Sequence, residues 1–427
     1  MKKVLALVLA VVMMLSLVAC GGNEPAESGG KETGVSEALL AAPAIAKDFD
    51  IKADFKFGVI CLHDENSTYD NNFLNGVKAA KEALGLTDEQ VLIKTNIPES
   101  TACYDAAIEL ADKGCNIIFA DSFGHEAFIA QAAKERPEIQ FCHATGTGSK
   151  YAYKTVANMH NAFASIYEGR YLAGIAAGLK LNEMINAGKI TAEQAVIGYV
   201  GAFTYAEVIS GMTSFFLGAR SVCPSATMKV RYTGSWYDQA LEQEAATALI
   251  EQDKCALISQ HADSLGAPTA CELAGVPNVS YNGSTYSAGE NTFIISSAIN
   301  WAPYFAYIIK CVNTGVEIDK DWCGSIATGS IVLSGINKGV MAEGSIEAIN
   351  AAIEQFKAGT LHVFATDKYT VEGKVDAGVA DVDGDYTPET NVVHDGYFDE
   401  SNAGQFRSAP YFDRIIDGVT NLNTNFG

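Results

Sequence analysis

The chain has 427 residues, 48% of them hydrophobic, and a formal net charge of −22. So acidic a protein repels phosphate backbones, which argues against nucleic-acid binding and against an electrostatic hold on anionic lipid. Once an N-terminal signal and a linker are set aside, about 380 residues remain, enough for two lobes.

The N-terminus indicates an export signal followed by a lipid-attachment site. A basic start precedes an apolar run from Val4 to Ala19, which is shorter than the roughly 20 residues that a membrane span needs. The tetrapeptide Leu17–Cys20 resembles a bacterial lipobox. We expect residues 1–19 to be a cleaved signal peptide, Cys20 to carry the lipid, and residues 20–47 to form a flexible tether. Acyl chains alone would hold the protein on the extracytoplasmic face of the cell membrane. The alternative is an uncleaved membrane helix.

Nine cysteines remain after Cys20, and none of them has the CxxC or CxxxC spacing of a metal site. Several lie inside apolar runs that read as strands, where a free cysteine behaves as a small hydrophobic residue. We expect mostly reduced core cysteines, with one or two disulfides as the alternative, and neither a metal nor a cofactor.

The folded part begins with alternating strands and helices. The pattern predicts strands at Phe55–Leu62, Val91–Thr95, Asn116–Ala120, Ile139–His143 and Val156–Met159, with helices Asn72–Leu84, Thr101–Lys113 and His125–Glu135 between them. The first of these helices has Phe73, Val77, Ala80 and Leu84 at helical spacing.

A second set of such units follows a predicted helix at Phe163–Leu181. Its predicted strands are Ala195–Gly201, Thr227–Thr233, Cys255–Ser259, Val279–Tyr281 and Thr292–Ser297, and its helices are Ala206–Arg220, Asp238–Glu251, Pro268–Ala274 and Ala302–Asn313. A helix at Gly344–Ala358 precedes short strands and turns beyond Thr366. This alternation predicts an α/β fold of two similar lobes, each with a parallel sheet covered by helices on both faces.

Polar and aromatic side chains gather where the predicted strands end. The segments are His63–Asp70, Asp121–His125, Gly201–Tyr205, Gly234–Asp238, His261–Ser264, Asn282–Ser284 and Asn300–Trp301. Open α/β sheets bind ligands beyond the carboxyl ends of their strands. Aromatic faces can enclose a flat heterocycle, while carboxylates and amides hold hydroxyls and ring nitrogens.

Each of these residues also has a purely structural interpretation. Asp70 can serve only as an N-terminal helix cap, and any single aromatic ring can pack in a core. His63, Asp64 and Glu65 are consecutive, so on an extended backbone they cannot all face one metal ion. The chain has no GxSxG, GxxxxGK[ST] or HExxH motif. A Ser-His-Asp site assembled in space stays open, although nothing requires one.

Several of these segments together resemble the basic membrane lipoproteins, or PnrA-like family, which are substrate-binding lipoproteins of ABC importers. The matching segments are Phe57–Ile60, Tyr69–Gly76, Ile117–Gly124, Tyr171–Ala177, Ile209–Gly211, Phe216–Arg220 and Ser296–Trp301. The similarity covers roughly residues 55–370 and agrees with the lipobox.

This resemblance implies a type 1 periplasmic-binding-protein fold, with two Rossmann-like lobes joined by a three-crossover hinge and a ligand between them. On this basis we expect residues 48–160 and 294–335 to form lobe I, and residues 161–293 and 336–427 to form lobe II.

The family's ligand site can be carried over by position. Asp70 and Phe73 would then serve a purine base, Asp121 the ribose hydroxyls, and Phe203 the second stacking face. Asn282 falls near an acidic family position, and Asn300–Trp301 stands where many members have lysine. The full candidate set is Tyr69, Asp70, Phe73, Asp121, Phe123, Phe203, Tyr205, Trp236, Asp263, Asn282 and Trp301.

The resulting hypothesis is a lipid-anchored, monomeric binding protein that is not an enzyme. It would capture a purine nucleoside or a related purine and deliver it to an ABC permease and its ATPase. The alternatives are a binding protein for a sugar or another small polar ligand, a surface nucleoside hydrolase, and a sensory partner of a membrane receptor.

Overall fold

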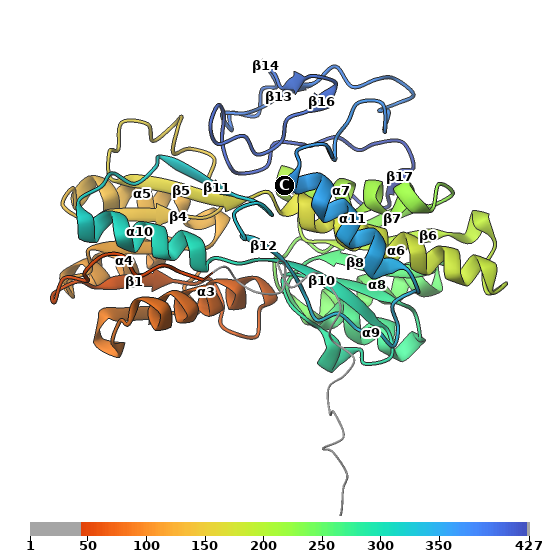
Figure 1. Ribbon diagram of the computed structural model, residues 1–427, viewed down its shortest axis with the longest axis horizontal. Helices are drawn as coiled ribbons and strands as arrows, with labels where there is room; N and C mark the ends of the chain where they lie inside the picture. The colour runs from red at the N-terminus through yellow and green to blue at the C-terminus, as the bar shows by residue number, and fades with distance from the viewer. Residues whose placement is uncertain (1–43, 425–427) are drawn as a thin grey trace, which may run out of the picture.

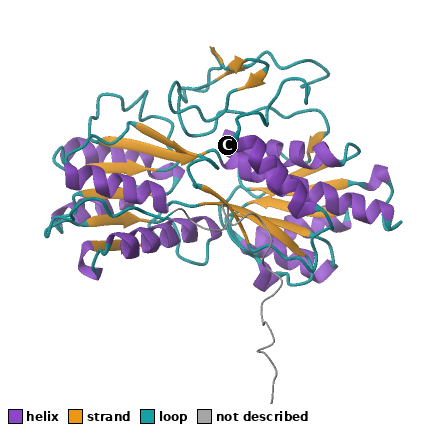
Figure 2. Ribbon diagram, in the orientation of Figure 1, coloured by secondary structure: helices purple, strands orange, loops and turns teal. Residues whose placement is uncertain are grey.

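The computed structural model describes residues 44–424, so the predicted signal peptide, Cys20 and most of the predicted tether lie outside the described residues. Two α/β lobes stand side by side, with the C-terminal part of the chain lying over both (Figure 1). In each lobe helices cover the faces of a central sheet (Figure 2). The prediction of two lobes built on parallel sheets is confirmed.

The first lobe contains a six-stranded sheet in which every strand pairs parallel to its neighbour. Its order is β11 (Asp321–Gly324), β5 (Met159–Ala164), β4 (Gln140–His143), β3 (Ile117–Ala120), β1 (Phe57–Ile60) and β2 (Val91–Lys94). Its helices are α3 (Thr68–Leu84), α4 (Thr101–Asp112), α5 (Glu126–Glu135) and α10 (Ala302–Thr314).

The second lobe contains a seven-stranded sheet that is parallel except for one edge strand. Its order is β12 (Ile331–Ser334), β10 (Phe293–Ile299), β9 (Asn278–Tyr281), β8 (Leu257–His261), β6 (Val196–Gly201), β7 (Thr227–Tyr232) and β17 (Val419–Asn421). Its helices are α6 (Ile166–Asn186), α7 (Ala206–Val222), α8 (Gln239–Glu251), α9 (Gly266–Ala274) and α11 (Ser345–Lys357).

The chain passes between the two sheets three times. It crosses after β5 at Ser165, returns between β10 and α10 at Asn300, and crosses again between β11 and β12. The expected lobe boundaries differ from this path, because residues 294–335 were assigned whole to the first lobe. β10 pairs in parallel with β9 and β12 pairs with β10, so both strands belong to the second sheet.

The first lobe is stabilised on one face of its sheet by an aromatic cluster. Phe73 of α3 stacks on Trp301 with ring centroids 4.4 Å apart, and Phe119 of β3 contacts Phe305 of α10 edge-on at 5.0 Å. These side chains are at most 1% exposed. Burying an aromatic side chain contributes about 2–3 kcal/mol, so this cluster fixes α3 and α10 against the sheet.

Two glycines allow α6 and α7 of the second lobe to pack closely. A Cβ added at Gly174 would lie 2.1 Å from the carbonyl oxygen of Phe215, and one added at Gly218 would lie 2.1 Å from that of Tyr171. Real Cβ atoms do not come so near backbone atoms, so any side chain at either position would push the helices apart. Both glycines fall in segments that resemble the family pattern.

Beyond α11 the chain forms a C-terminal segment, residues 358–424, with only short strands. These are β13 (Val379–Ala380), β14 (Thr390–Asn391), β15 (Val393–His394), β16 (Tyr397–Phe398) and β17. The segment contacts both lobes. Ser408 donates its backbone N–H to Asp321 of β11 at 2.9 Å, and β17 pairs in parallel with β7.

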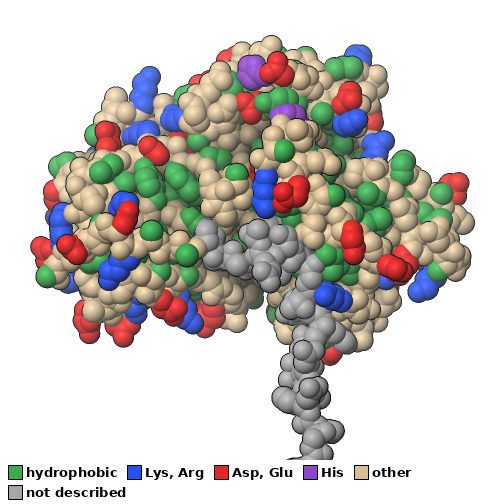
Figure 3. All heavy atoms as spheres, viewed as in Figure 1, with side chains coloured by type: hydrophobic (Ala, Val, Ile, Leu, Met, Phe, Trp, Pro, Cys, Tyr) green, Lys and Arg blue, Asp and Glu red, His purple; other side chains and the backbone are tan. Residues whose placement is uncertain are grey.

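All nine cysteines among residues 44–424 are free thiols, and eight of them are buried, as expected for reduced core residues. None of the helices formed by these residues is both long and apolar enough for a membrane span. Acidic and basic side chains are interspersed over the face in Figure 3.

Candidate functional site

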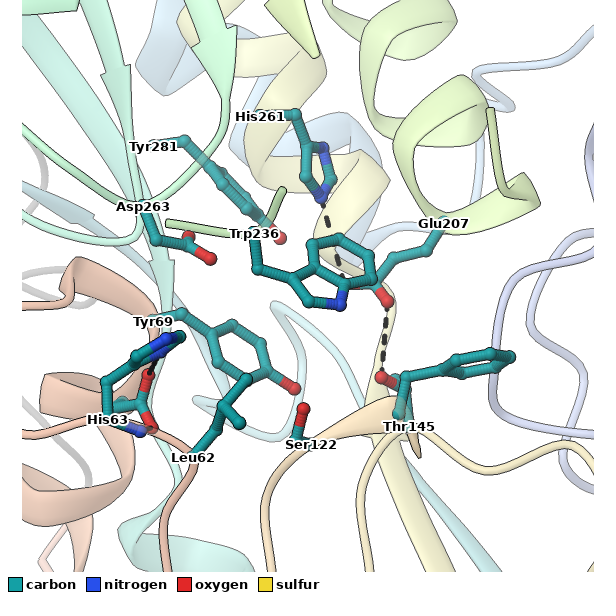
Figure 4. Close-up of a pocket in the computed structure, with 12 residues that line it drawn as sticks. Leu62, His63, Tyr69, Ser122, Thr145, Glu207, Trp236, His261, Asp263 and Tyr281 are labelled. Atoms are coloured by element: carbon teal, nitrogen blue, oxygen red, sulfur yellow. Dashed lines mark hydrogen bonds and ion pairs between the residues drawn. The ribbon is translucent and has the colours of Figure 1, made fainter. Parts of the chain in front are cut away.

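A small cavity of about 20 Å³ lies where the carboxyl ends of strands from both sheets meet (Figure 4). The lining residues are Leu62, His63, Tyr69, Asp70, Ser122, Phe123 and Thr145 from the first lobe, and Glu207, Trp236, His261, Asp263 and Tyr281 from the second.

On the first-lobe side, the start of α3 fixes Asp70 in the cavity wall. Ser67 is the N-cap of α3 and accepts a hydrogen bond from the N–H of Asp70. The Asp70 carboxylate in turn accepts from the N–H of His63 at 2.7 Å and from the Ser67 hydroxyl at 2.6 Å. Burial alone would raise the pKa of Asp70, but hydrogen bonds from His63 and Ser67 hold it below its ordinary value. Asp70 is therefore an ionised, oriented acceptor.

On the second-lobe side, the ends of β8 and β9 bring His261 and Tyr281 to the cavity. Both ring nitrogens of His261 and the hydroxyl of Tyr281 are buried and make no hydrogen bond with any described residue. His261 Nε2 lies 3.7 Å from Glu207 Oε1. Burial lowers the pKa of His261, and Glu207 opposes that effect. Buried polar groups are ordinarily satisfied, so the Tyr281 hydroxyl is available to a ligand.

Asp263 closes the same wall. Its Oδ1 accepts from Nδ2 of Asn282 at 3.1 Å. Burial raises the pKa of Asp263 well above its usual value, and the negative charges of Glu242 and Asp70 act in the same direction. A ligand that donates to this carboxylate would stabilise its charged form.

The charge of the lining sets a limit on the ligand. It contains three carboxylates, those of Asp70, Glu207 and Asp263, and no lysine or arginine. A phosphate or carboxylate ligand would enter without a cationic partner and would be repelled. The cavity therefore suits a neutral or cationic ligand that donates hydrogen bonds.

Direct hydrogen bonds join the lobes around this cavity. Thr68 donates its N–H to the carbonyl of Asp263 at 3.0 Å, Asn72 donates to Asn282 at 3.2 Å, and Thr145 donates to Glu207 at 3.2 Å. The structure therefore shows the two lobes closed on one another.

Five of the eleven predicted site residues line this cavity: Tyr69, Asp70, Phe123, Trp236 and Asp263. Tyr205 lines an adjoining hollow, stacked on Phe203 with ring centroids 5.0 Å apart. Phe203 does not line the cavity itself; its ring packs edge-on against Trp236 at 4.9 Å. Phe203 therefore supports Trp236 from behind.

Four predicted residues lie elsewhere. Phe73 and Trp301 stack on each other in the first-lobe core, because the N-terminal turn of α10 carries Trp301 under the sheet rather than to its edge. Asn282 is 1% exposed and acts through Asp263. Asp121 is fully buried behind the cavity wall.

Asp121 holds the wall together. Its Oδ1 accepts from the N–H of Leu62 at 3.0 Å, and its carbonyl accepts from the hydroxyl of Tyr69 at 2.8 Å. Burial raises its pKa, and the nearby charge of Asp70 raises it further. Cys61, Asp70 and Asp121 offer ligand atoms within 4.8 Å of one another, as do the half-buried Asp381 and Asp383 with the exposed Asp385 and Glu389. Asp70 and Asp381 already accept hydrogen bonds from protein donors.

The candidate set omitted seven lining residues: Leu62, His63, Ser122, Thr145, Glu207, His261 and Tyr281. His63, Ser122 and His261 fall in the strand-end segments that the sequence indicated. Tyr281 is the last residue of β9, one position before the indicated segment. Glu207 lies in the first turn of α7. Only its position a few residues after the end of β6 could have indicated from sequence that it lines the cavity.

Two α/β lobes with largely parallel sheets, three crossings and a closed cavity at the sheet ends form a fold of the periplasmic-binding-protein type. The model of the family "ABC transporter substrate-binding protein PnrA-like" matches residues 62–357. The chain therefore belongs to this family, which confirms the resemblance, and it is a substrate-binding protein of an ABC transporter.

Two relatives carry names that differ in ligand. A Haloferax volcanii protein, named as a candidate glucose-binding protein of an ABC transporter, is 33% identical over 303 residues, covering 70% of this chain and 72% of that protein. A purine-binding protein of Brucella abortus is 32% identical over 248 residues, covering 58% of this chain and 65% of that protein.

Solved structures agree on the fold. A solute-binding protein of an Aeropyrum pernix ABC transporter superposes with a TM-score of 0.57 at 16% identity, covering 76% of this chain and 94% of the other. A solute-binding protein of a Conexibacter woesei ABC transporter superposes with a TM-score of 0.56 at 18% identity, covering 72% of this chain and 98% of the other. At this identity the likeness concerns the fold.

Proposed function

We propose that this substrate-binding protein captures a purine base or purine nucleoside in the interlobe cavity. The observation that carries the proposal is a cavity with aromatic rings on both sides and an unpartnered hydroxyl on one wall. Trp236 and Tyr69 provide flat faces from opposite lobes, and Tyr281 provides an unused hydroxyl. A heterocycle with N–H and ring-nitrogen groups complements this set.

The roles of individual residues follow from their positions. Tyr69, Phe123 and Trp236 would contact the faces of the ligand's rings. Asp70 and Asp263 would accept hydrogen bonds from the ligand's N–H groups. Glu207 would accept a hydrogen bond from a ligand hydroxyl or N–H group at the rim of the cavity. The purine-binding relative from Brucella abortus supports this ligand class.

Capture would work through closure of the lobes. The ligand contacts both lobes, so it binds the closed state better and shifts the equilibrium by its differential affinity. Release requires the permease, powered by its ATPase, to separate the lobes.

We further propose that Cys20 carries a lipid that holds the monomer on the extracytoplasmic face. Replacing Cys20 by serine should then release the protein from membranes upon fractionation, whereas continued association would favour an uncleaved helix.

A sugar is the second candidate ligand, because aromatic faces with carboxylates also suit sugars and one relative is named for glucose. A thermal-shift panel of purine bases, nucleosides and sugars, followed by calorimetry of the hits, separates the two. Stabilisation by purines and not by sugars supports the proposal. The reverse result overturns it.

Catalysis is tested in the same preparation. Incubation with inosine, followed by an assay for free hypoxanthine, should show stoichiometric binding without turnover. Release of base in excess of the protein would indicate a nucleoside hydrolase and would contradict a pure binding role.

A further inference from the structure

A second hollow adjoins the interlobe cavity, and the C-terminal segment forms one of its walls. Its volume is about 330 Å³. The cleft contributes Phe123, Thr145, Thr147, Thr204, Tyr205, Ala206 and Glu207, and the C-terminal segment contributes Asp381, Gly384, Tyr386, Arg407, Ala409, Pro410, Tyr411 and Asp413. We call this hollow the outer chamber. The matched family region ends at residue 357, so this wall lies outside it.

Three residues are shared by the cavity and the outer chamber: Phe123, Thr145 and Glu207. The Thr145 hydroxyl donates to Glu207 Oε2 in this shared boundary, as Figure 4 shows. The other oxygen of Glu207 faces His261 in the cavity.

The wall of the outer chamber is firmly attached to both lobes. Ser408 bonds to Asn161 and Asp321 in the first sheet, and Met228 in the second sheet donates to the carbonyl of Gly418 at 2.8 Å. Arg407 is 5% exposed and donates to the carbonyls of Val382, Ala409 and Pro410. These bonds hold the segment as a fixed surface over the cleft.

The chemistry of the outer chamber favours a neutral group rich in hydroxyls. Its carboxylates are those of Glu207, Asp381 and Asp413, against the single guanidinium of Arg407. Carboxylates accept hydrogen bonds from hydroxyls, and this excess of negative charge disfavours a phosphate. Tyr205 and Tyr386 offer ring faces and hydroxyls, as sugar sites do, whereas the Tyr411 hydroxyl already bonds to Asp399 and Asn402.

We propose that the outer chamber is a second subsite, which takes the sugar of a neutral purine nucleoside whose base occupies the cavity. This proposal rests on the proposed function and adds that the C-terminal segment determines selectivity for the sugar. The protein would then bind a nucleoside more tightly than the free base, and more tightly than the nucleoside 5′-monophosphate.

The test is calorimetry of the full chain with hypoxanthine, inosine and inosine 5′-monophosphate. Tyr386→Ala and Asp413→Asn change exposed side chains of the chamber wall. Val375→Ala and Asp367→Asn are matched exposed controls in the same segment, outside the outer chamber. We expect each wall variant to weaken inosine binding about threefold to tenfold, with hypoxanthine affinity and both controls within about twofold of the original protein.

The possible failures are distinguishable. If the original protein binds neither hypoxanthine nor inosine, the proposed function is wrong, and this inference fails with it. If it binds purines but the wall variants leave the ratio of inosine to hypoxanthine affinity unchanged, only the second subsite is refuted. Tight binding of the monophosphate would also refute it.

Discussion

Thr145, just beyond β4 in the first lobe, donates its hydroxyl hydrogen to Oε2 of Glu207, in the first turn of α7 in the second lobe, at 3.2 Å. This hydrogen bond joins the lobes at the boundary between the cavity and the outer chamber. It is one of several interlobe bonds, and it is the one whose acceptor also faces His261.

Replacing Thr145 by valine should weaken closure, because valine keeps the shape and lacks the donor. A typical hydrogen bond contributes about 0.5–1.5 kcal/mol, and this one is long at 3.2 Å. We expect ligand affinity to fall about threefold to tenfold, mostly through faster dissociation in stopped-flow measurements. Thr145→Ser is the control and should retain the original rate. Equal dissociation rates for all three proteins would exclude a role of this bond in closure.

Replacing Trp236 by alanine should remove a ring face of the cavity. We expect ligand affinity to fall at least tenfold in calorimetry, because a large aromatic contact is lost. Trp236 is partly exposed, so thermal stability without ligand should change little. Trp236→Phe keeps a ring and should recover most of the affinity. Unchanged binding by the alanine variant would place the ligand elsewhere.

Replacing Trp301 by alanine should destabilise the fold rather than the site. Trp301 is 1% exposed and stacks on Phe73 in the core, so the free energy of unfolding should fall by about 3–5 kcal/mol. Urea denaturation measures this loss, with Trp301→Phe as a milder control. At a temperature where the alanine variant stays folded, its affinity should match that of the original protein. A large loss of affinity in the folded variant would show that Trp301 contacts the ligand.

Glu400 of the C-terminal segment should make stability fall as pH rises. Burial raises its pKa to about 8, so the folded chain keeps a proton that the unfolded chain releases near its ordinary pKa. Unfolding then releases a proton between about pH 4.5 and 8, and the free energy of unfolding decreases by up to about 1.4 kcal/mol per pH unit.

Buried histidines oppose this trend only at lower pH. Burial lowers the pKa of His125, His143 and His160 to about 4, so they contribute stability that is lost as pH falls from about 6.5 to 4. Burial also raises the pKa of Glu168 and of Glu242 to about 7, so both act in the same direction as Glu400, and comparison with a Glu400 variant is needed to isolate its share.

Glu400→Gln should remove this dependence. Urea denaturation at pH 6.5, 7.2 and 8 should show the variant losing less stability than the original protein as pH rises. Glu389→Gln, at an exposed position of the same segment, is the control and should run parallel to the original. Parallel curves for Glu400→Gln as well would mean that Glu400 is ionised in the folded protein.

The local pattern predicted most strands and helices, because apolar periodicity and helix caps act within a few residues. The start of α6 is an exception: the predicted helix from Phe163 begins at Ile166, since residues 159–164 pair as β5. The lobe to which β10 belongs could not be read from its own residues. That depends on pairing with β9, which the pattern of residues 293–299 does not encode.

Candidate residues line the cavity where a side chain follows a strand closely or begins a helix there. Trp236 and Asp263 lie a few residues beyond β7 and β8, and Asp70 lies in the first turn of α3. Trp301 also follows a strand, but its ring turns into the core, and a rotation of one helical turn cannot be read from spacing. The outer chamber was not predictable, because the C-terminal segment has few regular elements and its contacts join residues far apart in sequence.

Neither lobe is a continuous stretch of chain, and this affects any attempt to dissect the protein. Tyr232 at the end of β7 bonds to Asn423, 191 positions later, after the path has visited the first sheet again to form β11. Contacts at such separation form late, since the intervening loop must close first. A fragment ending before β17 would leave the edge of β7 open to pairing with another molecule. Separately expressed halves should therefore aggregate instead of yielding two independent folding units.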